Sequence, residues 1–335
     1  MYKFAQMSKE DRDFVFNQTA INKGITKEIV EKDFWVCLML DYLFTKSKYK
    51  NILTFKGGTS LSKGFNIINR FSEDIDLILN WTALGVGPFE PMEDRSNNKQ
   101  DLFNKSLNKK AEDFIEKELL RDIKENLSRL LETDIDIAID DKEKQVINFH
   151  YPKIYSDSND YIKQYVRLEI GPLAAWTPSL NVKIIPYVCE SMPTAFEIKN
   201  TSVLTVAPER TFWEKATILH REANRPKEKL MPSRYARHYY DLYMFSKTKY
   251  FLLALKNKDL LEKVVKFKTK FYRDNWANYD ECLQNNLKLV PPDYRLKELE
   301  KDYTKMREMF YGEIPTFSEI LKQLKIIENL INDKG

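Results

Sequence analysis

Two closely spaced patterns in the first third of the chain constrain its fold more than any other feature. A short apolar run at residues 52–55 leads into Gly57 and Gly58, and a second apolar run contains Asp74 and Asp76. A glycine pair permits a tight turn, and the residues between the two runs have a helical pattern. We therefore predict a strand, a glycine turn, a helix and a second strand in succession.

Asp74 and Asp76 are predicted metal ligands. Side chains two positions apart on a strand point to the same face, so both carboxylates are expected on one side of a sheet. Two carboxylates together form a hard oxygen site suited to Mg²⁺ or Mn²⁺. Burying carboxylates is costly unless their charge is compensated, and a metal ion supplies that compensation. The alternative is a strand at a solvent-facing edge, where alternating acids need no metal.

The glycine turn and four polar residues that follow it are predicted to contact a nucleotide. These residues are Gly57, Gly58, Thr59, Ser60, Lys63 and Ser72. Backbone N–H groups and hydroxyls at the start of a helix bind phosphate readily. The alternative is an ordinary strand-to-helix turn with a Thr or Ser N-cap. Because two strand carboxylates follow the turn, the combination favours chemistry on a nucleoside triphosphate.

Three charged residues outside these patterns are further catalytic candidates. Glu169 shares a strand face with Arg167, and it is expected to complete the metal site or to accept a proton; a surface ion pair with Arg167 is the alternative. Lys215, on a predicted helix, is expected to neutralise triphosphate charge, unless it is a solvated surface lysine. Asp241 is either a site-facing acid or the partner of Arg237 one helical turn before it.

Basic residues are concentrated in one part of the chain. The whole sequence has 54 Lys and Arg against 50 Asp and Glu, a net charge of +4, which is too small to diagnose nucleic-acid binding. Between residues 221 and 273, however, basic residues clearly outnumber acidic ones. This asymmetry favours a polyanionic partner, and a Lys-rich solvated helix face is the alternative. The predicted RNA contacts are Arg221, Arg225, Arg234 and Arg237.

The cysteines and the N-terminus argue against several classes of protein. The 3 cysteines form no CxxC motif and no cluster with histidine, so neither a disulfide framework nor a zinc site is supported. The N-terminal residues lack the apolar core of a signal peptide, and no apolar run is long enough to span a membrane. We therefore expect a soluble, cytoplasmic protein without a membrane partner.

Periodicity along the chain predicts an α+β fold. Strands and helices mix up to about residue 200, and a mainly helical part follows. Helices are expected within 8–44, at 102–131, 209–221 and 237–245, and through most of the chain after 251; strands are expected at 135–139, 146–151, 161–170 and 182–188, and loops at 82–100 and 155–160.

Taken in order, several segments resemble the AbiEii/AbiGii-type toxin nucleotidyltransferases of the polymerase-β-like superfamily. The segments are EKDFW from residue 31, FKGGTSLSK, RFSEDIDL, VRLEIG, ERTFWEKATILHRE and RHYYDLY, and they cover roughly residues 25–245. The resemblance implies a nucleotidyltransferase-like mixed sheet flanked by helices, with a mainly helical C-terminal region. It implies a core at residues 1–200 with N-terminal helices, and a helical domain at 201–335 that contributes to the active site.

The resemblance also implies an activity. Relatives transfer a nucleoside monophosphate from an NTP in a metal-dependent reaction, serve as toxins in toxin–antitoxin or phage-defence pairs, and in some cases modify tRNA 3′ ends. We therefore predict transfer to an RNA acceptor, the tRNA 3′ end foremost, with release of pyrophosphate and with a cognate antitoxin as a partner. The family motifs fall on Gly57, Gly58, Asp74, Asp76, Lys215 and Asp241, with Glu169 as the third carboxylate; His238 stands where many relatives have an acid.

Two alternative functions stay open at this point. The first keeps the same chemistry but modifies a protein or a small molecule, which the nearly balanced net charge permits. The second is an inactivated nucleotidyltransferase that only binds nucleotide or RNA. The intact glycine pair and the intact aspartate pair argue against it, because an inactive site could lose both.

Overall fold

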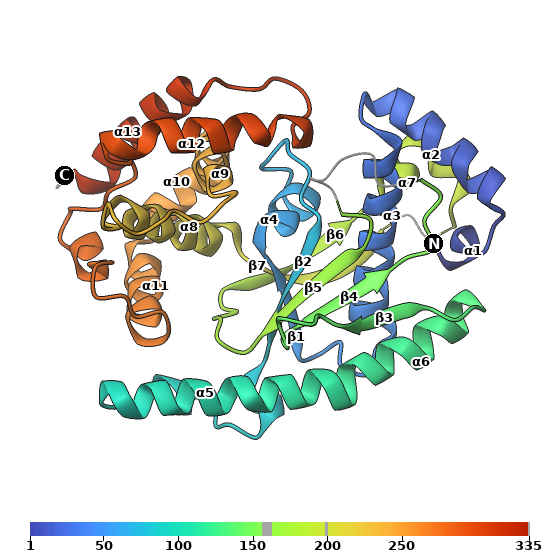
Figure 1. Cartoon of the computed structure of the whole chain (residues 1–335), viewed down its shortest axis with the longest axis horizontal. Coiled ribbons are helices and arrows are strands. Elements are labelled where there is room, and N and C mark those ends of the chain that lie inside the picture. The colour runs from blue at the N-terminus through green and yellow to red at the C-terminus, as the bar shows by residue number, and fades with distance from the viewer. Residues whose placement is uncertain (156–162, 198–199, 334–335) are drawn as a thin grey trace. The chain divides into compact units, whose positions relative to one another are not determined.

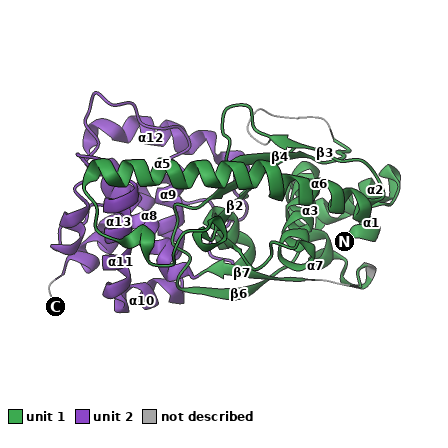
Figure 2. Cartoon of the chain, turned by 90° about the horizontal axis from the view of Figure 1, so that it is seen from below, with its two compact units in different colours: residues 1–65, 71–206 green, residues 66–70, 207–335 purple. Residues whose placement is uncertain are grey.

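The computed structural model describes residues 1–155, 163–197 and 200–333, and the chain divides into two compact units (Figure 2). Unit 1 contains residues 1–65 and 71–206, and unit 2 contains residues 66–70 and 207–335. The segment 66–70 therefore belongs with the C-terminal part of the chain, although it lies between two segments of unit 1 in the sequence.

Unit 1 is built on a mixed sheet of seven strands (Figure 1). The strands are β1 (Leu53–Lys56), β2 (Asp74–Leu79), β3 (Asp136–Ile139), β4 (Val146–His150), β5 (Val166–Gly171), β6 (Ser179–Ile184) and β7 (Thr201–Val206). Their order across the sheet is β3-β4-β5-β2-β1-β7-β6. Strand β2 is parallel to β5, and β1 is parallel to β7, while the other neighbours are antiparallel. The two strands of the predicted strand–turn–helix–strand unit, β1 and β2, are therefore central neighbours.

The helices of unit 1 flank this sheet. They are α1 (Tyr2–Ala5), α2 (Lys9–Lys23), α3 (Lys27–Asp41), η1 (Tyr42–Lys46), α4 (Gly57–Thr59), η2 (Ser60–Gly64), η3 (Trp81–Leu84), η4 (Glu90–Met92), α5 (Asn97–Phe114), η5 (Ile115–Leu119), α6 (Leu120–Leu131), α7 (Tyr187–Ser191) and η6 (Pro193–Ala195). The Ser8 hydroxyl accepts a hydrogen bond from the Asp11 N–H, and the Thr26 hydroxyl accepts one from Ile29. These N-caps begin α2 and α3 within the segment 8–44, where helices are expected.

Helix α3 lies in the core of unit 1. It packs against β2, β5 and β7, and apolar side chains such as Val30, Phe34 and Trp35 are buried on its different faces. A helix that is buried all round belongs in the interior rather than on the surface. Unusually, the charged residues 31–33 of the same helix are buried too.

Unit 2 is helical apart from its segment 66–70 and the connecting loops. Its elements are α8 (Pro208–Ala223), α9 (Ala236–Phe245), α10 (Lys249–Lys256), α11 (Lys258–Phe271), η7 (Tyr279–Leu283), α12 (Asp293–Lys305), η8 (Arg307–Met309) and α13 (Phe317–Asn332). Helix α8 packs against α9, α10 and α11, and most of its side chains are buried. Pro208 occupies the first turn of α8, where its missing N–H is not needed.

The structure confirms the predicted mixed sheet, its flanking helices and the helical C-terminal region. The predicted loop at 82–100 is wrong in part, because the single-turn helices η3 and η4 occur there and α5 already begins at Asn97. The predicted strand at 182–188 is wrong at its end, because Pro186 N-caps α7 after β6 stops at Ile184. The strand β7 was missed, and most of the predicted loop at 155–160 lies outside the described residues.

The predicted strand at 161–170 is also shorter than expected. Its first two residues lie outside the described part of the chain, and β5 begins only at Val166. Among the described residues, no helix combines the length and the apolar character that crossing a membrane requires.

Candidate functional site

The glycine turn lies directly against the aspartate pair. Strand β1 ends at Lys56, and the chain turns at Gly57 with a φ of +83°, in the left-handed region that favours glycine. A Cβ atom at this position would collide with the Oδ2 atom of Asp76. Glycine is therefore required at residue 57 both by the backbone conformation and by the closeness of the carboxylate.

The hydroxyls that follow the turn hold it in place. Thr59 Oγ1 donates a hydrogen bond to the carbonyl oxygen of Asp74, at 2.5 Å, and Ser60 Oγ donates one to the carbonyl oxygen of Gly57, at 2.8 Å. Both side chains are buried. Since the first bond ties the turn to the first residue of β2, Thr59 fixes the distance between the predicted phosphate-binding turn and the predicted metal ligands.

Asp74 and Asp76 share one face of β2, as predicted. Both are half-buried, while Ile75 between them is fully buried on the opposite face. In the parallel register of β2 and β5, Asp74 lies beside Arg167 and Asp76 beside Glu169. Three strand-borne carboxylates of the sequence prediction are therefore neighbours in the sheet.

Several carboxylates lie close to Asp74. Burial, and then the carboxylates of Glu73, Asp76 and Glu169, together raise its pKa to about 7, while Lys32 opposes them. One carboxyl of this group therefore takes up a proton near neutral pH when no cation is close. Such a set of half-buried acids fits a divalent cation, because the cation replaces the proton as the compensating charge.

Among the described residues, no group of three or more His, Cys, Asp and Glu is arranged to hold a metal ion. Two carboxylates are nevertheless a sufficient protein contribution for Mg²⁺, which often takes its other ligands from substrate phosphates and water. The residues present therefore fit a metal that arrives with a triphosphate better than a resident structural metal.

Glu169 is held in an ion-pair network beside the aspartates. Arg167 Nε lies 2.9 Å from Glu169 Oε1, and the same guanidinium lies 2.8 Å from Glu143 and 3.6 Å from Asp140. The Arg–Glu pair that the sequence left open is present, and Glu169 still lies beside Asp76. The two interpretations of this residue are compatible.

Lys63 and Ser72 are the other predicted nucleotide contacts in unit 1. They have different surroundings from the residues of the glycine turn. The Lys63 ammonium is buried, 2.8 Å from Asp33 Oδ1 and 3.6 Å from the centre of the Tyr187 ring. It holds η2 against α3 and α7 in this structure. Ser72 is half-buried, two residues before Asp74.

Unit 2 brings Lys215 and Asp241 together. Lys215 Nζ on α8 lies 2.8 Å from Asp241 Oδ2 on α9. Arg70 binds the same carboxylate with two nitrogens, Nε to Oδ1 at 2.8 Å and Nη2 to Oδ2 at 2.9 Å. All three side chains are buried, and Asp241 is completely so. Asp241 therefore interacts with two cations that are distant from it in the sequence.

The electrostatics of this cluster lower the pKa of Asp241, of Lys215 and of the neighbouring His238. Burial alone would raise the pKa of Asp241, but Arg70 and Lys215 hold it well below its usual value, so the carboxylate is ionised. Burial lowers the pKa of Lys215, and Arg70 and Arg237 lower it further, against the pull of Asp241. His238, whose Nδ1 is 3.5 Å from Lys215 Nζ, is neutral, because burial and the nearby cations hold its pKa well below 6.5.

Arg70 belongs to this cluster although it is not among the site residues predicted from the sequence. It is the first residue of the RFSEDIDL segment, in which the predicted metal ligands are the aspartates. The local indication of this residue in the sequence is its position four residues before Asp74, a predicted metal ligand. Its partner Asp241 is 171 residues away, so no local pattern could reveal the pair.

The four predicted RNA contacts are placed in unit 2. Arg221 binds Asp274 and Glu222, Arg225 binds Glu222, and both guanidinium groups lie within 5 Å of the Trp276 ring centre, at 4.7 and 4.8 Å. The backbone N–H of Arg234 donates to Asp302, at 2.8 Å, and Arg237 is half-buried close to Lys215. Arg221 and Arg225 have structural ion pairs, and their contact with RNA stays a prediction.

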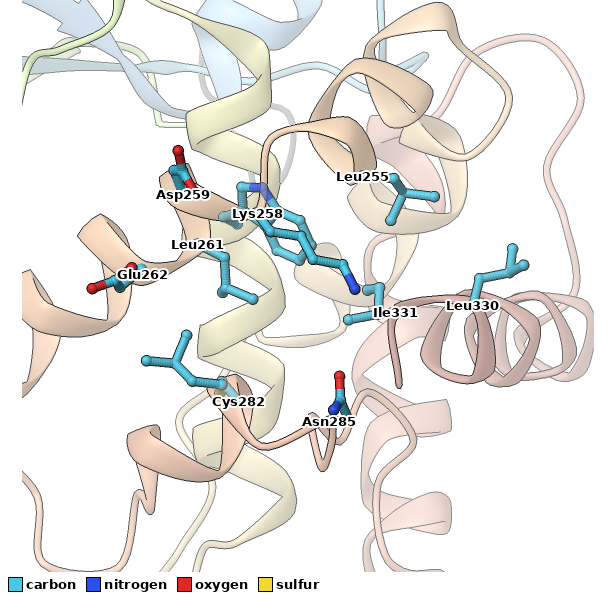
Figure 3. Close-up of a pocket in the computed structure, with 11 residues that line it drawn as sticks. Leu255, Lys258, Asp259, Leu261, Glu262, Cys282, Asn285, Leu330 and Ile331 are labelled. Carbon is cyan, nitrogen blue, oxygen red and sulfur yellow. The ribbon is translucent and has the colours of Figure 1, made fainter. Parts of the chain in front are cut away.

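A cavity of about 260 Å³ lies elsewhere in unit 2 (Figure 3). Leu255, Leu261, Leu330 and Ile331 form its apolar lining, and Lys258 extends along it. None of the predicted site residues lines this cavity. It is therefore separate from the Arg70–Lys215–Asp241 cluster.

Comparison with known proteins relates the chain to one kind of enzyme. Residues 39–323 match the family model described as the nucleotidyl transferase AbiEii toxin of type IV toxin–antitoxin systems. No curated protein matches the sequence. The solved structure of MenT4, a nucleotidyltransferase toxin from Mycobacterium tuberculosis H37Rv, aligns over 98% of this chain and 91% of its own, at 15% identity and a TM-score of 0.52.

JHP933 from Helicobacter pylori aligns over 92% of this chain and 93% of its own, at 15% identity and a TM-score of 0.42. At 15% identity, the likeness to MenT4 is a likeness of fold, and it confirms the predicted mixed sheet with a helical C-terminal region.

Proposed function

The chain belongs to the AbiEii family of nucleotidyl transferase toxins, and from this premise we propose that it transfers a nucleoside monophosphate to an RNA 3′ end, tRNA foremost, and releases pyrophosphate. Family membership makes the protein a nucleotidyltransferase of a type IV toxin–antitoxin system, with an NTP substrate and a cognate antitoxin. The observation that carries the rest of the proposal is the contact between the Gly57 turn and the carboxylate of Asp76.

Asp74 and Asp76 are the proposed ligands of Mg²⁺ or Mn²⁺, with Glu169 as a neighbouring third carboxylate. When bound, the metal would lower the pKa of the acceptor hydroxyl and neutralise charge on the leaving pyrophosphate. Asp76 touches the position where a Gly57 side chain would begin, so the turn can bring a triphosphate close to these carboxylates.

The proposed reaction is a displacement at the α-phosphorus of the NTP. The acceptor oxygen forms a bond to this phosphorus, the bond to the β-phosphate bridging oxygen breaks, and pyrophosphate leaves with the electron pair. Glu169, next to Asp76, is the carboxylate proposed to receive the acceptor proton. Lys215 is proposed to offset charge on the triphosphate, since its ammonium shares Asp241 with Arg70.

Incubation with labelled NTPs, Mg²⁺ and total tRNA tests this proposal. We expect label in the tRNA fraction with the unaltered protein and none above background with Asp74→Ala or Asp76→Ala. Transfer by either variant at the rate of the unaltered protein would contradict the proposed metal site.

The acceptor is the second point to test. RNA is favoured by the excess of basic residues between 221 and 273, although Arg221 and Arg225 are already engaged with acids. Labelled cell extract digested separately with nuclease and with protease distinguishes RNA from a protein acceptor. Label that survives nuclease and is lost with protease would show that the acceptor is a protein.

The toxin activity is testable in cells. Induced expression is expected to arrest growth, and Asp74→Ala is expected to relieve the arrest. Arrest that persists with Asp74→Ala, at equal protein level, would separate toxicity from nucleotidyl transfer.

A further inference from the structure

The segment 66–70 is anchored in unit 2 by its backbone as well as by a side chain. Arg70 and Phe310 form an isolated antiparallel bridge, and the N–H of Tyr311 donates to the carbonyl oxygen of Asn69 at 3.1 Å. The Tyr311 hydroxyl donates to the carbonyl oxygen of Arg70 at 3.3 Å. The main chain of Arg70 is therefore fixed before its side chain reaches Asp241.

The Arg70 side chain meets Asp241 in a bidentate geometry. Its Nε and Nη2 atoms bind the two carboxylate oxygens, and Arg70 is only 2% exposed. Lys215 shares Oδ2 with this guanidinium. Bidentate arginine–carboxylate pairs are directional, so Asp241 is held in one orientation and presents Oδ2 to the lysine.

The charges of this cluster do not cancel. Arg70 and Lys215 carry two positive charges against the single negative charge of Asp241, and Arg237 adds a third cation nearby. His238 contributes no compensation, since it is neutral. A buried surplus of charge is costly unless a ligand of opposite sign balances it. The cluster therefore favours an anion.

We propose that Arg70 is a positioning residue for nucleotidyl transfer: by occupying Asp241 in a bidentate pair, it keeps the Lys215 charge available to the phosphates of the NTP. Without Arg70, Lys215 and Asp241 would form a closed, neutral pair, and the ammonium would attract phosphate less. This inference rests on the proposed function, which identifies the anion as an NTP. What it adds is the role of Arg70.

Three variants of the full chain test the role of Arg70. Binding of a non-hydrolysable NTP analogue, measured by calorimetry in the presence of Mg²⁺, is independent of the acceptor. We expect Arg70→Met to weaken binding by about tenfold or more, and Arg70→Lys to weaken it less, because Lys keeps the charge but loses the bidentate geometry. In the double variant Arg70→Met/Asp241→Asn, one cation and one anion are removed together, so we expect binding to recover relative to Arg70→Met.

Arg210→Met is the matched control. Arg210 is as buried as Arg70 and lies on the same helix as Lys215, but it pairs with Glu214, at 2.9 Å. We expect this variant to lose stability and to keep the affinity for the NTP analogue. Circular dichroism spectra and thermal melts establish that each compared variant is folded.

The outcomes separate the two proposals. If the unaltered protein binds no NTP analogue, the proposed function fails. If the unaltered protein binds and Arg70→Met binds equally well, or if Asp241→Asn adds to the loss in the double variant, the role of Arg70 is wrong while the proposed function stands. Should Arg70→Met not fold, binding by Arg70→Lys equal to that of the unaltered protein would contradict the bidentate requirement.

Discussion

At residue 57, two independent constraints require glycine. The positive φ of Gly57 disfavours any L-residue, and the Asp76 carboxylate occupies the place of a Cβ atom. Gly85 has a similar φ of +71°, but a Cβ atom there would meet nothing within 4 Å. The chain therefore contains its own control for separating backbone strain from the contact with Asp76.

We expect Gly57→Ala to abolish most of the activity and Gly85→Ala to preserve it. Both substitutions carry a backbone cost of about 1 kcal/mol in the free energy of unfolding, but only the first displaces Asp76. A displaced carboxylate is expected to lower label transfer about a hundredfold. The measurement is initial transfer rate together with urea unfolding of both variants. Equal activity of the two variants would show that the contact with Asp76 does not matter for catalysis.

Cation affinity is expected to depend on pH through Asp74. Burial raises the pKa of this carboxyl to about 7, so protons compete with a divalent cation below that pH and not above it. Mn²⁺ affinity, measured by calorimetry on either side of pH 7, should fall on the acid side. In Asp74→Asn the affinity should be low at every pH. An affinity that is the same on both sides in the unaltered protein would contradict this assignment.

The site residues differ in how far the sequence could predict them. Gly57, Asp74 and Asp76 lie in a local pattern of glycine turn and alternating strand, and their neighbourhood follows from the pairing of β1 with β2. Arg70 could not be predicted from a local pattern, because its role depends on a partner 171 residues away. Lys63 was assigned to the nucleotide from its place near the turn, but only the packing of α3 shows its pairing with Asp33.

Among the elements, α3 connects the parts of unit 1 through three consecutive charged residues. Glu31 accepts a hydrogen bond from the N–H of Ile154, at 2.7 Å. Lys32 lies 2.6 Å from Glu73, which immediately precedes β2, and Asp33 pairs with Lys63 of η2, at 2.8 Å. A charged triplet inside a buried helix is tolerated because each member has a partner on a different segment.

We expect Glu31→Gln to stabilise unit 1 at alkaline pH. Burial raises the pKa of Glu31 from 4.5 to about 7, although hydrogen bonds from the backbone N–H groups of Ile154 and Tyr155 lower it. For an acid with a raised pKa, the contribution to stability is fully present below the unfolded value and is lost as the pH rises through about 7. The variant cannot ionise, so it should gain about 2 kcal/mol over the unaltered protein at pH 8 and little at pH 5. Urea unfolding at both pH values measures this difference; an equal gain at both would exclude ionisation as the cause.

The elements themselves were predictable where local signals are strong. Ser8 and Thr26 mark the starts of α2 and α3, and the alternation around Asp74 marks β2. The end of β6 was misplaced because its apolar residues continue past Pro186 into α7, and a short apolar run does not distinguish a strand from a helix. The pairing of β7 with β1 depends on residues far apart in the sequence, which a local pattern does not show.

On the scale of the whole molecule, the chain passes between the two units after residues 65, 70 and 206. The middle segment, 66–70, connects η2 of unit 1 to β2 of unit 1 while it packs in unit 2. Loss of structure in unit 2 therefore releases the segment that leads into the aspartate strand. The folding of the two units is expected to be coupled for this reason.

Buried thiols can report this coupling. Cys37 and Cys189 lie in unit 1 and Cys282 in unit 2; burial raises the pKa of Cys282 to about 12 and that of Cys37 well above its usual value. Thiols of this kind react slowly with alkylating reagents until their surroundings unfold. We expect Cys37 and Cys282 to become reactive at the same urea concentration, as detected by mass spectrometry of labelled peptides. Two separate midpoints would show that the units unfold independently.

The crossing of segment 66–70 also restricts how such a molecule can be recombined. A chimera made by a single exchange after residue 206 would join a foreign C-terminal part to a native segment that carries Asn69 and Arg70. The foreign part would then have to supply its own counterparts of Phe310, Tyr311 and Asp241 for that segment. Exchanges between relatives should therefore yield active proteins more often when the segment 66–70 and the helical part are transplanted together.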